Sequence, residues 1–318
     1  MLDFKRSIIS ALVLTPACAL AGLLTTPFPD SLWVMNDDGT QSAISPIPAG
    51  NAQNTPQPSW GVGQWSGLYP LTYPYTQTLQ SNGNWQLSNA SASVQYDKTT
   101  EPWLGGVYTL AQNGVGIACH SAPHSEYDLF LIPKNNQANH GVNAQNAPNG
   151  MQATGPLSSL QSLSFNLGIQ IKYEAIGSNC APSQAGYLLG LMLRHTGTGK
   201  ILFYQLVFRA VRRDGNSIVP IHSTNDAWTE FGNWGFGDDI RNVSPTLAVP
   251  VPGGPRVAYS ADILPRLKTL IQTGGPNGNT FDSNVANYTV ISAYLGSHVW
   301  GATQVTTSFD NFNLISTP

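Results

Sequence analysis

The chain has 318 residues, of which only 14 are Lys or Arg and 17 are Asp or Glu, for a formal charge of −3. So few basic residues argue against nucleic acid or an anionic membrane surface as a partner, because both require clustered Lys and Arg. One small cluster, Arg209, Arg212 and Arg213, is interpreted as the solvated end of a strand. Low charge with many Gly and Pro residues is typical of an extracellular β-protein.

Residues 1–21 have the features of a secretory signal peptide. Lys5 and Arg6 precede a short apolar run that ends in small residues at Ala21, so we expect cleavage near Ala21 and secretion to the periplasm or the extracellular space. Lipidation of Cys18 is the alternative. No later segment approaches the ~20 apolar residues that a membrane-spanning helix needs, so no membrane span is expected.

Residues 22–82 are rich in Pro, Gly, Asn and Gln. The apolar stretch 32–35 predicts one strand, and we expect a long irregular excursion after it. Its aromatic residues, Trp65 among them, argue against disorder.

Residues 119–133, CHSAPHSEYDLFLIP, place histidines and carboxylates in front of an apolar run that predicts a strand. Glu126 and Asp128 would point to one face of that strand, which makes Glu126 the first candidate for acid–base catalysis, with Asp128 as its charged neighbour. The alternative is a pair of ordinary surface acids. His120 and His124 with these acids also suggest a metal site, but the spacing lacks the helical pattern of zinc motifs, so no metal is expected.

Two cysteines remain beyond the signal segment, Cys119 and Cys180. In an oxidising compartment such a pair favours a disulfide over a catalytic thiol.

The clearest strand is 163–173, in which apolar and polar residues alternate, as in a strand with one wet face. Residues 186–195 and 200–214 are nearly continuous apolar strands joined by a Gly turn, and we expect them in central positions. A polysaccharide lyase is one possible function. Such an enzyme needs a base and a group that neutralises a uronate, and Gln170, Lys172, His124 and Tyr127 are residues of the required types.

The segment 222–242 combines acids with aromatic residues in a Gly-rich sequence. Trp228 and Trp234 could stack on sugar rings, as could Trp65, and Glu230 is the second candidate for a catalytic carboxylate. The alternative is a structured loop whose Trp residues cover the core, with a local ion pair between its aspartates and an arginine.

One helix is expected over residues 260–273, with Ser260 as its N-cap and Gly274 as its end. Residues 288–301 and 305–316 then close the chain as two strands. His195 and His298 lie near strand ends and are interpreted as structural histidines.

The closing pattern, YLGSHVWG followed by SFDNFNL, resembles the last strands of concanavalin A-like lectins and glucanases. This resemblance implies a curved sheet whose concave face binds a polysaccharide and often hydrolyses or eliminates it. Glucanases of that class place Glu-x-Asp-x-Glu on one strand. Glu126 and Asp128 match the first two positions, but Phe130 occupies the third, so the second catalytic carboxylate would have to come from another strand.

We therefore expect an all-β antiparallel sandwich, a concanavalin A-like jelly roll, over residues 83–318, forming one domain with 22–82. The expected function is polysaccharide degradation by a secreted hydrolase or lyase. The alternatives are a lectin-like binding or adhesion module and a structural envelope protein. The sequence has no P-loop, dinucleotide fingerprint or Gly-x-Ser-x-Gly motif, so neither a cofactor nor a serine nucleophile is expected.

Overall fold

The computed structural model describes most of the chain from Ala21 onward. Only the backbone is described at Ala21, Trp65, Gln77, Leu79 and over residues 32–35, 41–44 and 224–230. The described residues are 21–24, 32–35, 41–44, 60–65, 71, 76–100, 106–114, 126–133, 151–178, 183–221, 224–230, 233–274 and 281–318. Several sequence predictions lie outside them: the signal peptide up to residue 20, lipidation of Cys18, and those on Cys119, His120, His124 and Cys180.

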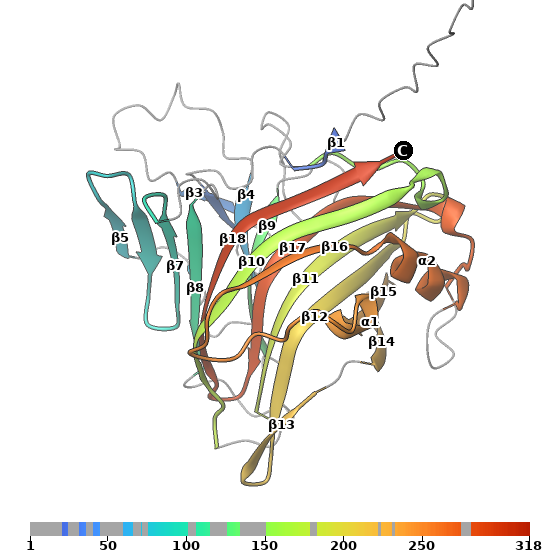
Figure 1. Cartoon of the computed structure of the whole chain (residues 1–318). Helices are drawn as coiled ribbons and strands as arrows, with labels where there is room; N and C mark the ends of the chain where they lie inside the picture. Colours follow the sequence, from blue (N-terminus) through green and yellow to red (C-terminus); the bar gives the residue numbers. More distant parts are fainter. Residues whose placement is uncertain are drawn as a thin grey trace, which may run out of the picture.

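The described strands form two sheets (Figure 1). The eight-stranded sheet has the order β16 (Val257–Asp262), β10 (Ser162–Ala175), β18 (Gln304–Thr317), β8 (Val107–Asn113), β7 (Ala92–Asp97), β6 (Trp85–Ser88) and β5 (Thr76–Leu79), with β1 (Ala21–Gly22) beside β18. The ten-stranded sheet has the order β14 (Thr224–Glu230), β15 (Asn233–Asp239), β12 (Ile201–Asp214), β11 (Gln184–His195), β17 (Tyr288–Trp300), β9 (Glu126–Pro133), β4 (Trp60–Trp65), β2 (Leu32–Met35) and β3 (Gln41–Ile44), with β13 (Ser217–Pro220) beside β12.

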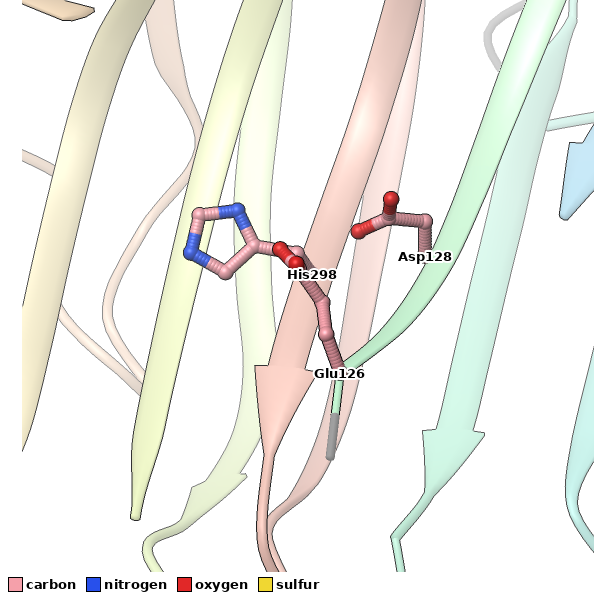
Figure 2. Close-up of side chains that lie close together, drawn as sticks. All are labelled: Glu126, Asp128 and His298. Carbon is pink, nitrogen blue, oxygen red and sulfur yellow. The ribbon is translucent and has the colours of Figure 1, made fainter. Parts of the chain in front are cut away.

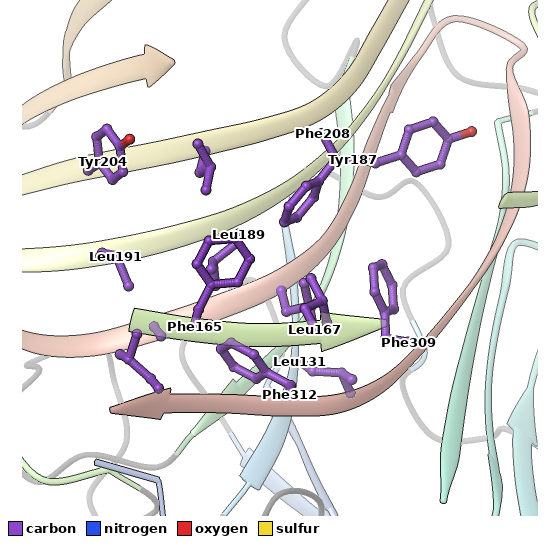
Figure 3. Packing of buried hydrophobic residues seen from close by; sticks show 14 of the residues in the cluster. Leu131, Phe165, Leu167, Tyr187, Leu189, Leu191, Tyr204, Phe208, Phe309 and Phe312 are labelled. Carbon is purple, nitrogen blue, oxygen red and sulfur yellow. The ribbon is translucent and has the colours of Figure 1, made fainter. Parts of the chain in front are cut away.

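The hydrophobic core lies between the two sheets (Figure 3). Alternate residues of β10, such as Phe165 and Leu167, are buried and face Leu189 of the opposite sheet. The ring of Phe208 stacks on Tyr259 across the interface, with centroids 4.8 Å apart. The period-2 pattern therefore defines the inner faces of both sheets, and the prediction of an all-β sandwich is confirmed. Most pairings are antiparallel, and the described exceptions are β12 with β15 and β2 with β4.

The predicted excursion before residue 83 contains strands that the sequence analysis missed. In β4, Trp60, Val62 and Gln64 are buried, while Gly61 and Gly63 alternate with them. Glycine conceals this period-2 pattern, because it adds neither an apolar nor a polar signal. β4 joins the ten-stranded sheet beside β9.

The packing helix, α2 (Leu264–Gln272), begins later than predicted. Ser260 lies in β16, paired with Asn166, and is not the N-cap. The Asp262 carboxylate accepts a hydrogen bond from the backbone N–H of Leu264. Gly274, with φ of +73°, follows the helix as predicted, because glycine adopts that conformation without strain. A short helix, α1 (Ile240–Val243), and 3-10 turns at Leu157–Ser159 and Val285–Asn287 complete the described elements.

A buried ion pair joins the sheets at one end of the sandwich. Glu174 of β10 accepts two hydrogen bonds from Arg209 of β12 and one from the hydroxyl of Tyr187 of β11. Arg213 of β12 donates to the backbone oxygens of Ile176 and Gly177. Two of the three clustered arginines therefore point into the sandwich and connect its layers. None of the described helices is long and apolar enough to cross a membrane.

Candidate active site

The residues of interest lie on the outer face of the ten-stranded sheet, the face turned away from the core. Trp300 of β17 pairs with Glu126 of β9, and His298 pairs with Asp128 of the same strand. Directly paired residues of antiparallel strands project to the same face. Their neighbours in sequence, Tyr127 and Val299, are buried in the core, so these four side chains face outward.

Glu126, Asp128 and His298 form a compact cluster on that face (Figure 2). One oxygen of each carboxyl group and one ring nitrogen of His298 lie within 4.8 Å of one another. All three side chains are partly exposed. The two acids come from one strand and the histidine from its neighbour, so the cluster depends on the pairing of β9 with β17.

The position of His298 depends on a glycine in the next strand. A Cβ atom at Gly186 of β11 would lie 2.3 Å from the His298 ring, so only glycine leaves room for the imidazole there. Nε2 of Gln184 lies 3.1 Å from Nε2 of His298. An amide nitrogen only donates hydrogen bonds, so this ring nitrogen accepts, and the proton of the neutral ring sits on Nδ1.

Burial lowers the pKa of His298 below its ordinary value, while the charge of Glu126 acts in the opposite direction. The imidazole is therefore neutral at neutral pH. A neutral imidazole can accept or donate a proton, which suits it for acid–base chemistry beside two carboxyl groups. The sequence analysis interpreted His298 as structural. Its position within an apolar strand, two residues before a Trp, was the only local signal.

Trp300 adds an aromatic surface beside the cluster. Its ring lies at 34° to the imidazole of His298, with centroids 6.4 Å apart, and it is partly exposed. Trp65 of β4 pairs with Asp128 and so occupies the next register position across the sheet. Trp65 was predicted from the sequence as a stacking residue, and Trp300 was not.

Phe130 occupies the position of the third carboxylate in the Glu-x-Asp-x-Glu pattern. It is 3% exposed and packs edge-on against Tyr294 of β17, with centroids 5.1 Å apart. It belongs to an apolar cluster on the outer face that includes Leu188 and Ile291. The polar site thus occupies one end of the outer face. Where a second catalytic carboxylate was expected from another strand, β17 supplies His298 to the two acids of β9.

The structure does not bring Gln170 and Lys172 to this cluster. Both lie on β10 of the eight-stranded sheet. They alternate with Ile169 and Ile171, which point into the core, so their own side chains point away from it. The side-chain amide of Gln170 donates to the backbone oxygen of Gly254, and Lys172 lies 3.4 Å from the hydroxyl of Thr109.

Glu230 and Trp228 are also distant from Glu126. Their strand, β14, is five strand positions from β9, and at about 4.8 Å per step this separates them by roughly 24 Å. A glycosidase needs its two carboxyl groups within about 10 Å. Glu230 therefore cannot pair with Glu126 at one glycosidic bond.

Trp234 and the aspartates after it belong to the packing of the sandwich. Trp234 packs against the core beside Phe281, with Lys200 4.7 Å above its ring. The fully buried Asp238 accepts hydrogen bonds from Arg266, Tyr204 and Asn242. Asp239 is paired with Arg241. Trp234 and the Asp239–Arg241 pair therefore match the alternative interpretation, but the segment forms the strands β14 and β15 where a loop was expected.

The cluster of Glu126, Asp128 and His298 could also hold a metal ion. Two carboxylate oxygens and one imidazole nitrogen are ligands that divalent first-row metals accept. The metal site considered from the sequence contained the same two acids, but with His120 and His124, which lie outside the described residues.

No family model matches the chain, and no curated protein sequence is similar to it. Similar solved structures include the family 11 xylanase from Neocallimastix patriciarum, with 6% identity, a TM-score of 0.39, and 76% of this chain and 95% of that chain covered. Endoglucanase 3 of Trichoderma harzianum, from family GH12, has 12% identity, a TM-score of 0.34, and coverages of 78% and 99%. The family 12 xyloglucanase from Bacillus licheniformis has 10% identity, a TM-score of 0.36, and coverages of 76% and 97%.

These neighbours are β-jelly-roll glycoside hydrolases with a concanavalin A-like sandwich fold. The sandwich architecture of this chain itself follows from its two packed sheets.

Proposed function

We propose that the protein is a secreted enzyme that degrades a polysaccharide, with Glu126 and Asp128 as its catalytic carboxyl groups. The observation that carries this proposal is the cluster itself. Two carboxyl groups and a neutral imidazole lie within 4.8 Å of one another on a partly exposed sheet face, in a chain with only 17 acidic residues. An aromatic ring, Trp300, lies beside them.

The separation of the two acids favours hydrolysis with retention of the anomeric configuration. Retaining glycosidases hold their carboxyl groups about 5–5.5 Å apart, and inverting enzymes need about 6.5–9.5 Å to admit a water molecule. The oxygens of Glu126 and Asp128 lie within 4.8 Å of each other, slightly below the separation of retaining enzymes and well below that of inverting enzymes.

In this mechanism one carboxylate attacks the anomeric carbon while the other carboxyl group gives its proton to the glycosidic oxygen. The bond to the leaving sugar breaks, and a glycosyl ester forms on the enzyme. The second group then takes a proton from water, which attacks the anomeric carbon and releases the sugar. His298 is neutral and is held by Gln184, so it adds no positive charge beside Glu126 and Asp128. Its Nδ1–H can donate a hydrogen bond.

Secretion is supported by the sequence before Ala21, with its positive start, apolar run and small residues. Ala21 and Gly22 pair with Ser316 and Ile315 of β18. Cleavage directly after Ala21 would remove the first of these two pairs and leave Gly22 at the start of the mature chain.

The test compares the wild type with Glu126→Gln and Asp128→Asn on neutral and uronate polysaccharides. Reducing ends report hydrolysis, and absorbance of unsaturated products reports elimination. We expect reducing ends alone from the wild type, and a loss of about 10²–10⁴-fold in either variant, the usual contribution of an acid–base group. Asp262→Asn, which removes an exposed acid of β16 in the eight-stranded sheet and keeps a side-chain oxygen that can accept hydrogen bonds, is the matched control and should retain full activity.

The other outcomes are distinct. Unsaturated products would show that the protein is a lyase and not a hydrolase. Binding without turnover by the wild type and the variants would show that it is a lectin-like binding module. Turnover that a chelator abolishes and a divalent ion restores would make the cluster a metal site. A wild type that neither binds nor cleaves any glycan would refute the proposal.

A further inference from the structure

Four side chains on neighbouring strands form one row across the outer face of the ten-stranded sheet. Glu126 of β9 pairs with Trp300 of β17, which pairs with Gln184 of β11, which pairs with Arg212 of β12. We name these residues the Glu126–Arg212 row. At about 4.8 Å per strand, it spans roughly 14 Å, longer than a single sugar ring.

Arg212 differs from the two arginines close to it. Arg209 is paired with Glu174 of the opposite sheet, and Arg213 donates to backbone oxygens just after β10, so both point inward. Val211 is also buried in the core. Because side chains alternate along a strand, Arg212 projects from the outer face. Its side chain is exposed and forms no hydrogen bond or ion pair with the part of the chain that the structure describes.

The charges along the row are asymmetric. Glu126 and Asp128 place negative charge at one end, and the guanidinium of Arg212 places positive charge at the other. Trp300 and Gln184 lie between them and offer a stacking face and an amide. Asp214, two residues beyond Arg212, shares the face at the outer margin of the sheet. An acidic group on a ligand would be repelled at the carboxylate end and bound at the guanidinium end.

We propose that the Glu126–Arg212 row binds a polysaccharide with acidic substituents, and that Arg212 binds a carboxylate on a sugar removed from the cleaved bond. This inference rests on the proposed function and names its substrate class. The sugar at the carboxylate pair is neutral, Trp300 stacks on the ring beside it, and the guanidinium forms a bidentate pair with the acidic group further along the chain. The row thereby sets the direction in which the glycan lies.

The experiment measures binding to pairs of glycans that share a backbone and differ in acidic groups. Carboxymethyl cellulose is compared with hydroxyethyl cellulose, and glucuronoxylan with arabinoxylan, using full-length protein carrying Glu126→Gln to prevent degradation. We expect tighter binding of the acidic member of at least one pair, and an approximately tenfold loss of that affinity in Arg212→Gln, the effect of one charge-assisted contact. Affinity for the neutral member should not change.

Two further variants separate recognition from nonspecific attraction. Arg194→Gln removes a cation from the other end of β11, about 30 Å away on the same face, and should leave the preference intact. Arg212→Lys keeps the charge without the planar fork and should recover only part of the affinity.

The inference is overturned if no acidic glycan is preferred, if no glycan is bound, or if Arg212→Gln and Arg194→Gln have equal effects. Turnover by the native enzyme is scored separately, so the proposed function can fail while the effect of Arg212 on binding persists.

Discussion

At the scale of single residues, His298 shows how neighbours determine what a side chain can do. Its ring lies over Gly186 and beside Gln184, and burial lowers its pKa. An exposed histidine next to two acids would instead gain a proton and neutralise them. The neutral ring leaves the charge of Glu126 and Asp128 available for chemistry.

Because the folded ring is neutral, the stability of the wild type should depend on pH, and this dependence should be weaker in His298→Gln. The unfolded imidazole takes up a proton near its ordinary pKa of about 6.5, whereas the folded one resists protonation until lower pH. The wild type should therefore lose stability as pH falls below about 6.5, by at most about 1.4 kcal/mol per pH unit from this group.

Urea unfolding of both proteins between pH 7.5 and 5 measures the difference, and the other histidines cancel in the comparison. Equal slopes would contradict a lowered pKa of His298. A steeper loss in the variant would indicate that the folded ring is protonated and is stabilised in that form by the nearby acids.

At the scale of elements, β11 combines a structural and a functional role along one strand. Its inner face contributes Tyr187, Leu189 and Leu191 to the core. On its outer face, Gly186 and Gly190 leave space for the rings of His298 and Tyr294 from β17. Glycine in a central strand costs stability, and here the close approach of a ring explains it.

We predict that Gly186→Ala lowers the proposed polysaccharide-degrading activity while the protein still folds. The added Cβ would lie 2.3 Å from the imidazole of His298 and would force that ring away from Gln184 and the two acids. Overpacking of this kind costs about 1–3 kcal/mol, and the displaced ring should lower turnover at least tenfold.

The matched control is Gly190→Ala, whose Cβ would lie 2.0 Å from the ring of Tyr294. It should cost similar stability but leave the cluster, and therefore the activity per folded molecule, nearly unchanged. Thermal unfolding and initial rates measured together distinguish the two. Equal losses of activity would show that Gly186 matters only for folding.

At the scale of the whole molecule, the outer face depends on how the two sheets are held together. The core between them supplies most of the stability. The buried pair of Glu174 and Arg209 ties β10 to β12 across the layers, with side chains that are 5% and 18% exposed. Burial, followed by the charge of Glu174, raises the pKa of Tyr187, so its hydroxyl stays protonated and donates to that carboxylate.

We predict that Arg209→Met lowers the free energy of unfolding by about 3 kcal/mol, because it leaves the carboxylate of Glu174 buried without its cation. The double variant Glu174→Gln, Arg209→Met should lose less than the sum of the two single changes, because it removes both charges together. Denaturant unfolding measures all three.

Arg212→Met is the control for this comparison, since this neighbouring arginine is exposed. It should change stability by less than about 0.5 kcal/mol. A strictly additive double variant would show that the two charges do not stabilise each other.

The sequence by itself determined the strands and the faces they bury, because the alternation in 163–173 or at Glu126 and Asp128 is a local property of the backbone. Prediction from the sequence failed at β4, where glycines hide the alternation. It also failed at Ser260, a residue typical of a helix N-cap that here lies in the strand before the helix. Gln170 and Glu230 had suitable chemistry, but the sheet topology places them far from Glu126.

Only the tertiary structure decided which strands lie side by side. The pairing of β9 with β17 brings His298 and Trp300 to the two acids, and the pairing of β11 with β12 sets Arg212 in the same row. Such register depends on contacts between segments far apart in the chain, which no periodicity of a single segment encodes.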